Sequence, residues 1–185
     1  KSIDKDKLYS FLREMEFNRL LSQAISFYGE PNIKKFGVEN KFKKQSKINT
    51  KEYKSITEEK KLNKIVDDLN GKSIFAVDTE TTSLNPQEAE LVGISLSYAV
   101  NASFYIPIGH RNARSLSKEY VISKLKPILE DPSIKKVGQN IKYDYIIFKK
   151  YGVELTSIED TMLLSYTLDA GNNRHNMDTL SELHL

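Results

Sequence analysis

The feature that most constrains the fold is a short apolar run that ends in two acidic residues. Residues 74–77 read Ile-Phe-Ala-Val, and Asp78 and Glu80 follow at once. An apolar run of this length is typical of a central strand that is buried on both faces. Alternate residues of a strand point to the same face, so the two carboxylates are held side by side despite their repulsion. We therefore expect a positive partner at the C-terminal end of this strand, where open α/β sheets bind their ligands.

The remainder of this region alternates between strand and helix patterns. Two further strands joined by a two-residue connection predict an antiparallel hairpin. Strands that first pair antiparallel and then alternate with helices indicate an α/β domain with a mixed sheet. The expected strands are 73–78, 91–100, 103–109 and 135–138, and the expected helices are 117–131, 142–152, 160–169 and 176–185.

The first 56 residues differ in pattern and in charge. Apolar residues recur at helical spacing from Lys5 to Phe27, which predicts one amphipathic helix that ends at Gly29. Residues 32–56 are rich in Lys and Asn and lack a period, as in a linker or a weakly ordered extension. Residues 1–56 hold 13 Lys or Arg against 7 Asp or Glu, whereas residues 57–185 hold 15 against 18. We therefore expect a basic extension over 1–56 and a folded domain over 57–185, which begins with a helix over Thr57–Leu69 capped by Ser55 or Thr57.

Composition excludes several classes of protein. The absence of cysteine rules out disulfides, a thiol nucleophile and a cysteine zinc site, and it favours a reducing compartment. The apolar stretches are too short to span a membrane, and the first residues are charged. We expect a cytoplasmic monomer that does not contact a membrane.

A second polar cluster repeats the arrangement of the first. A short strand ends at Gly138, Gln139 and Asn140 follow, and Asp144 lies in the first turn of an apolar helix. Asp-x-Glu alone is expected about once by chance, and Asp144 could merely favour a helix N-terminus through the macrodipole. If the three carboxylates converge, however, their oxygen atoms and negative charge suit Mg²⁺ or Mn²⁺.

Seven blocks in the same order resemble a known family. They are "FAVDTETTSL", "YIPIGH", "KPILED", "KVGQNIKYD", "YGVEL", "DTMLLSYTLD" and "RHNMDTL". They are similar to the proofreading 3'-to-5' exonuclease domain of bacterial DNA polymerase I, a member of the DEDD exonuclease superfamily. The resemblance implies a ribonuclease H-like mixed sheet flanked by helices, truncated at its C-terminus and preceded by a helical extension. The segment "FLREMEFNRLL" resembles the part that joins the 5' nuclease region to this domain, which implies a larger enzyme with a polymerase domain beyond Leu185.

The resemblance also implies roles for individual residues. It makes Asp78 a bridging ligand of two divalent cations, Glu80 a ligand of the cation that holds the attacking water, and Asp144 a ligand on the leaving-group side. Two such ions can activate a water and stabilise the departing oxygen of a phosphodiester.

Four more residues match positions that contact the single-stranded 3' end of DNA. Leu84 matches a wedge against the terminal bases, Asn140 and Tyr143 match contacts to the 3' end, and Arg174 matches an arginine near the phosphates. Read without the family, they are a core residue, a helix cap, a packed aromatic residue and a surface charge. Asp160 lies in a shared block, but we expect it to cap a helix.

The family pattern breaks in two places, of which the smaller is Asn176, where many relatives carry an aspartate. Relatives carry a fourth carboxylate in a Tyr-x-x-x-Asp helix, and no such motif follows His175. We expect a metal-dependent exonuclease that removes nucleotides from DNA 3' ends in replication and repair, with this chain by itself weakly active or inactive. The alternatives are a non-catalytic scaffold module of a polymerase and an exonuclease that trims RNA 3' ends.

Overall fold

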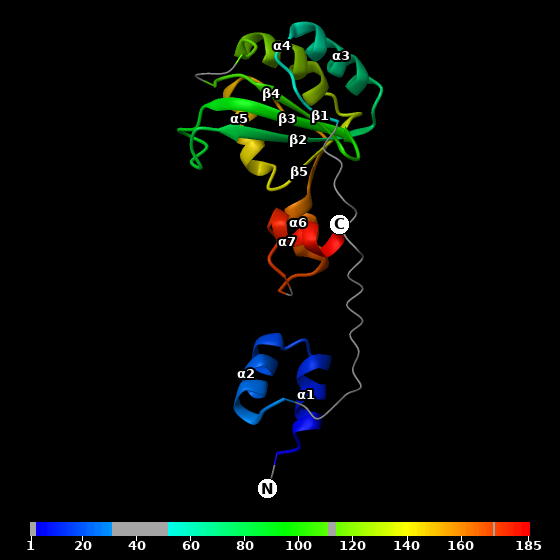
Figure 1. Ribbon diagram of the computed structural model, residues 1–185, viewed down its shortest axis with the longest axis vertical. Coiled ribbons are helices and arrows are strands. Elements are labelled where there is room, and N and C mark those ends of the chain that lie inside the picture. The colour runs from blue at the N-terminus through cyan, green and yellow to red at the C-terminus, as the bar shows by residue number, and fades with distance from the viewer. Residues whose placement is uncertain (1–2, 31–51, 111–113, 172) are drawn as a thin grey trace. The chain divides into compact units, whose positions relative to one another are not determined.

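The computed structural model describes residues 3–30, 52–110, 114–171 and 173–185 (Figure 1). The chain divides into two compact units, Lys1–Gln45 and Ser46–Leu185. Most of the predicted linker lies outside the described residues. No helix among those ranges is long and apolar enough to cross a membrane.

The first unit is a pair of helices, so the prediction of a single helix over Lys5–Phe27 is wrong. Helix α1 spans Lys5–Glu14 and helix α2 spans Asn18–Tyr28. The chain turns between them at Glu16, whose φ of 57° is left-handed. The turn lets α1 pack on α2, which buries Tyr9, and the Tyr9 hydroxyl donates to the Gly29 carbonyl oxygen at 2.6 Å. The amphipathic pattern therefore serves a helical hairpin.

The second unit contains a mixed sheet, as predicted, and this sheet has six strands. Its strand order is β1-β4-β3-β2-β5-β6. Strand β3 pairs antiparallel with β2 and β4, whereas the pairs β1–β4, β2–β5 and β5–β6 are parallel. The strands are β1 Glu52–Ser55, β2 Ile74–Thr81, β3 Leu91–Ala99, β4 Ala102–Pro107, β5 Lys135–Gly138 and β6 Ile158–Asp160.

Two of these strands were not predicted. Strand β1 lies in the stretch that was assigned to the basic linker, so residues 52–55 belong to the sheet. Strand β6 ends at Asp160, the first residue of the segment predicted to be helical, and Ile158 and Glu159 were assigned to no element. Each of the two strands is four residues or fewer, and a strand that short offers little alternation to read, although β5, also of four residues, was predicted.

The helices of the second unit follow the predicted order. They are α3 Glu59–Asn70, α4 Lys118–Leu129, α5 Lys142–Lys150, α6 Thr161–Leu168 and α7 Met177–His184. Helix α3 ends at Gly71 as predicted, but its N-cap is Glu58 instead of Ser55 or Thr57. In Figure 1, α3 and α4 lie side by side over the sheet, and α6 and α7 lie beyond β5.

Strand β2 is central but is buried on one face only, which corrects the expectation of two buried faces. Phe75 and Val77 are each 2% exposed and share one hydrophobic cluster with residues of α3, α4 and α5. On the opposite face Ile74 is 49% exposed, and Ala76 is exposed as well. The open face is the one that carries Asp78 and Glu80, and covering these carboxylates with apolar side chains would be unfavourable.

A buried lysine ties β5 to its neighbouring loops. The Lys136 side chain is fully buried, and its Nζ donates to the carbonyl oxygens of Asp131 and Ile134, each at 2.7 Å. We expect Lys136→Met to lower the free energy of unfolding by about 2–4 kcal/mol, because both carbonyl groups lose their donor. Urea denaturation followed by circular dichroism measures this change.

The adjacent residue gives a matched control. Lys135 forms a surface ion pair with Glu159 at 2.7 Å, and its side chain is 44% exposed. Lys135→Met should change stability by less than about 1 kcal/mol. Equal losses in the two variants would contradict the role given to Lys136.

Candidate active site

The acid pair lies in the second half of β2, on the open face of the sheet. Asp78 pairs with Ser95 and Glu80 with Gly93 of the antiparallel neighbour β3. Burial, and then the charge of Glu80, raise the pKa of Asp78. Among the described residues no Lys, Arg or His forms an ion pair with either carboxylate. The positive partner that the sequence predicts is therefore not supplied by these parts of the protein.

The third predicted carboxylate, Asp144, enters from the first turn of α5. It is only 2% exposed, and its Oδ1 accepts hydrogen bonds from the Thr79 backbone amide at 2.8 Å and from the Thr79 hydroxyl at 2.6 Å. Burial, together with the smaller effect of the charge of Asp78, raises the pKa of Asp144 to about 6, against the lowering effect of the Thr79 hydrogen bonds. Asp144 is thus a buried acid that joins α5 to β2 beside Asp78.

The three carboxylates line one cleft of about 520 Å³. Leu84, Asn140 and Tyr143, which were predicted to bind substrate, line it as well. The complete lining is Asp78, Thr79, Glu80, Thr81, Thr82, Ser83, Leu84, Gln139, Asn140, Tyr143 and Asp144.

The donor chemistry of the cleft fits a hard divalent cation, because carboxylate oxygens carry negative charge that no cation of the described residues balances. The carboxylates do not, however, form a closed ligand set. Within the described ranges no group of three or more His, Cys, Asp or Glu side chains is arranged to hold a metal ion. Oδ1 of Asp144 accepts both hydrogen bonds from Thr79, so Oδ2 is the oxygen atom that these bonds leave uncommitted.

Leu84 projects from the loop between β2 and β3. Its side chain is 96% exposed, so it is not a core residue. An apolar side chain in this position can pack against a base, which has an apolar face.

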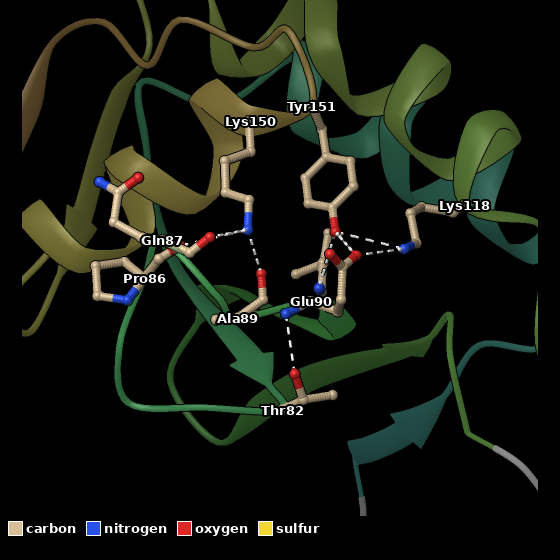
Figure 2. A network of polar contacts seen from close by, with 9 residues as sticks. Thr82, Pro86, Gln87, Ala89, Glu90, Lys118, Lys150 and Tyr151 are labelled. Carbon is tan, nitrogen blue, oxygen red and sulfur yellow. Dashed lines mark hydrogen bonds and ion pairs between the residues drawn. The ribbon is translucent and has the colours of Figure 1, made fainter.

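The loop that carries Leu84 is anchored by the end of α5 (Figure 2). Lys150 donates to the carbonyl oxygens of Ala89 at 2.6 Å, Gln87 at 3.1 Å and Pro86 at 3.4 Å. The Tyr151 hydroxyl donates to Glu90 at 2.7 Å. Helix α5 therefore contributes Asp144 from its first turn, and Lys150 and Tyr151 at its C-terminal end hold the loop between β2 and β3.

Tyr143 is held at the rim of the cleft by polar contacts. Its hydroxyl lies 2.5 Å from the Thr81 hydroxyl and donates to the carbonyl oxygen of Ser83. These contacts connect α5 to the segment that follows the acid pair, and the ring is half-buried against the core.

Asn140 adopts a left-handed conformation with a φ of 55°, which Asn tolerates better than most residues. It is not the cap of α5, because Ile141 occupies that position. Its backbone amide donates at 2.9 Å to Asp160, which also caps α6 as predicted.

Arg174 is exposed and does not line the cleft. Its loop is joined to the cleft through Gln139, whose side-chain amide donates to the carbonyl oxygen of His175 at 2.7 Å. The side-chain oxygen of Gln139, Oε1, accepts a hydrogen bond from the Thr161 hydroxyl at 2.5 Å. Sequence reasoning noted Gln139 but gave it no role, and it gave none to Thr79, which alternation places on the buried face.

Solved structures of other proteins share the fold of the second unit. The EXO domain of Nibbler from Aedes aegypti matches with a TM-score of 0.55 and 15% identity, over 69% of this chain and 61% of that one. RNase D from Trypanosoma brucei matches with a TM-score of 0.51 and 19% identity, over 62% of this chain and 40% of that one. The ribonuclease H-like α/β fold that the sequence predicts is confirmed.

The family is identified by sequence. The model of the family described as 3'-5' exonuclease matches residues 53–185, and the chain belongs to this family. DNA polymerase I of Rhizobium leguminosarum is 41% identical over 144 residues, 67% of this chain, and that of Borreliella burgdorferi is 36% identical over 135 residues, 72% of this chain. The chain spans 14% of the length of each of these relatives. The predicted 3'-5' exonuclease domain of the DNA polymerase I type is confirmed.

The Lys150 anchor predicts how firmly the loop is held. Lys150→Met removes the donor to three loop carbonyl groups, and a hydrogen bond to a charged group contributes about 1.5–3 kcal/mol. We expect the backbone amides of residues 87–90 to exchange with solvent at least about tenfold faster. Hydrogen exchange followed by NMR measures this rate.

Lys149 provides the control for that change. It contacts Glu154 at 3.5 Å on the surface, so Lys149→Met should leave exchange in the loop unaltered. Unchanged exchange in Lys150→Met would show that other contacts hold the loop.

The raised pKa of Asp144 predicts a dependence of stability on pH. The ordinary value of 3.8 rises to about 6 in the folded protein, so the folded state binds the proton more tightly than the unfolded chain. This contribution to stability is present below pH 4 and is lost as the pH rises through 6, by about 3 kcal/mol in total. Urea denaturation in EDTA at pH 4 and pH 7.5 measures the loss.

Asp144→Asn should remove most of this loss, because the amide cannot ionise and its oxygen can still accept from Thr79. The variant should therefore be less sensitive to pH than the wild type in the absence of metal. The same change in stability with pH in both proteins would contradict the assignment.

Proposed function

We propose that the chain hydrolyses the 3'-terminal phosphodiester of single-stranded or frayed DNA with the help of two divalent cations, as the proofreading step of a DNA polymerase. The observation that carries the proposal is the cleft in which Asp78, Glu80 and Asp144 lie without a balancing cation. Three acids kept together in this way raise the free energy of the metal-free protein, and bound cations would relieve it.

Each carboxylate has a distinct task in this proposal. Bound Mg²⁺ or Mn²⁺ would supply an activated water and neutralise the charge that develops on the departing oxygen. Asp78 would be a ligand of both ions. Glu80 would hold the ion on the side of the attacking water, and Asp144 would bind through Oδ2 on the leaving-group side, fixed by Thr79.

The other cleft residues would position the end of the strand. The exposed Leu84 side chain would pack against the terminal base, and Asn140 and Tyr143 would contact the terminal nucleotide. We place Arg174 near the backbone phosphates, because a guanidinium group binds phosphate oxygens in pairs. Its loop would have to bring it toward the cleft on binding.

We further propose that the domain works within a longer polymerase chain and in replication and repair. The length of the relatives supports this, since the chain spans 14% of the DNA polymerase I of Rhizobium leguminosarum. We expect the fourth carboxylate, in a Tyr-x-x-x-Asp helix, to come from that longer chain. A non-catalytic role is disfavoured, because this chain keeps all three carboxylates.

The test is cleavage of a single strand labelled near its 5' end, by a chain long enough to include the Tyr-x-x-x-Asp helix. We expect removal of single nucleotides from the 3' end of DNA with Mg²⁺ or Mn²⁺, and none with EDTA. Asp78→Ala should reduce the rate by at least about a thousandfold, because the shared ligand of both ions is lost.

An RNA strand of the same sequence distinguishes the alternative substrate, because a 2'-hydroxyl can be sensed directly. Faster cleavage of RNA would favour an RNA-trimming enzyme. Equal rates in the wild type and in Asp78→Ala would contradict catalysis at this cleft.

A further inference from the structure

A tyrosine lies on the same face of the sheet as the acid pair. Tyr105 of β4 pairs with Ser95 of β3, which pairs with Asp78 of β2. Residues directly opposite each other in antiparallel strands point to the same face. Tyr105 therefore stands two strands from Asp78, on the open side of the sheet, and is half-buried there.

The Tyr105 ring lies across Gly93 and needs the absence of a side chain there. A Cβ atom on Gly93 would lie 2.1 Å from the Tyr105 hydroxyl oxygen and 2.5 Å from Cζ, which is far inside contact distance. Any other residue at position 93 would push the ring away. The glycine thus brings the hydroxyl from β4 over to β3.

Gly93 is the residue that pairs with Glu80, so the hydroxyl is brought next to Glu80. Cβ atoms of such a pair are about 4.5–5.5 Å apart. The hydroxyl occupies nearly the place of the missing Cβ, and rotation of the Glu80 side chain can bring its carboxylate within hydrogen-bonding distance. Within the described part of the chain, that carboxylate has no hydrogen bond or ion pair of its own.

The hydroxyl is itself oriented by a histidine. The Tyr105 hydroxyl lies 2.5 Å from Nε2 of His110, and the two rings meet at 57°. When Nε2 carries the proton, His110 donates to the tyrosine oxygen, and the tyrosine O–H is free to donate elsewhere. An ordinary tyrosine hydroxyl, with a pKa of about 10, keeps its proton near neutral pH.

We propose that Tyr105, oriented by His110 and accommodated by Gly93, is a positioning residue that donates a hydrogen bond to Glu80 and fixes this carboxylate for its divalent cation. The inference rests on the proposed function, in which Glu80 is a metal ligand. It adds a relay from His110 through Tyr105 to Glu80, and ligating carboxylates held by such partners bind metal more tightly. Adjacent hydrogen bonds in a relay also strengthen one another.

Binding of Mn²⁺ to the 185-residue chain, measured by the EPR signal of free Mn²⁺, tests the relay without relying on catalysis. Tyr105→Phe keeps the ring and removes the donor, and we expect it to weaken Mn²⁺ binding about tenfold. His110→Ala should weaken binding to a similar extent, and the double variant should be no worse than either, because one relay is lost in each case. His110→Gln, which keeps an N–H donor, should bind nearly as the wild type does.

Two further variants separate positioning from a general effect on folding. Tyr98→Phe removes a hydroxyl from a tyrosine of β3 that packs against the core and bonds to Asp68 at 3.0 Å, so Mn²⁺ binding should not change. Gly93→Ala should displace the Tyr105 ring and weaken Mn²⁺ binding at least as much as Tyr105→Phe. Unaltered binding in both Tyr105→Phe and Gly93→Ala overturns the inference and leaves the proposed function intact.

Failure of the proposed function would appear in the wild-type chain, before any variant is compared with it. If the wild-type chain does not bind Mn²⁺, Glu80 is not a metal ligand in this chain, and the contact is then judged by NMR in the absence of metal. Glu80→Gln should shift the ring resonances of Tyr105 and His110 if the relay exists. Unshifted resonances overturn the relay whatever the outcome with Mn²⁺.

Discussion

The structure of the site depends on one buried interaction, in which Thr79 donates two hydrogen bonds to a single oxygen of Asp144. It joins residues 65 positions apart in the sequence and fixes the first turn of α5 against the centre of β2. A carboxylate buried to this extent is unfavourable in its charged form, which is why its pKa rises to about 6. The folded protein buries Asp144 despite this cost, and a third acidic side chain therefore lies beside Asp78 and Glu80.

Alternation along β2 explains how one strand serves both the core and the cleft. Phe75, Val77 and Thr79 point into the covered face, whereas Asp78 and Glu80 point to the open face. Thr79 is the residue at which the two roles meet, because it lies on the covered face and binds a site residue. Helix α5 continues the arrangement, since it presents Asp144 and Tyr143 at its start and anchors the Leu84 loop through Lys150, its last residue, and Tyr151, its C-cap.

The sequence predicted the parts of the fold that have a strong period and failed where local patterns end. Strands β2, β3 and β4, the four-residue strand β5 and the helices of the second unit were found, and the pattern of the longer elements is long enough to read. The single helix over Lys5–Phe27 was wrong, because a turn at Glu16 has no glycine or proline to mark it and the apolar residues fit a hairpin equally well. Strand β1 was assigned to a linker, because its four residues, Glu-Tyr-Lys-Ser, are stabilised by pairing with β4 instead of by their own pattern.

The positions of some predicted site residues follow from local sequence patterns, whereas the positions of others depend on contacts between distant segments. Asp78, Glu80 and Asp144 share a cleft because strand alternation and a helix start determine their places, and the sequence displays both. The sequence does not display that Asp144 would be fixed by Thr79, or that Arg174 would lie outside the cleft, since each depends on contacts between distant segments.

The open face of the sheet connects the electrostatics of the site to its function. A sheet with two carboxylates on one face cannot cover that face with apolar side chains unless their charge is balanced. Among the described residues, small or hydroxyl-bearing residues such as Gly93, Ser95 and Ser97 surround Asp78 and Glu80 on this face. The Tyr105 ring packs against Gly93. These groups leave room beside the acids and can orient water or a carboxylate, whereas bulky apolar groups would exclude both. The well-packed opposite face holds the backbone of β2 in place. The carboxylates on the polar face therefore keep positions that suit the binding of a cation.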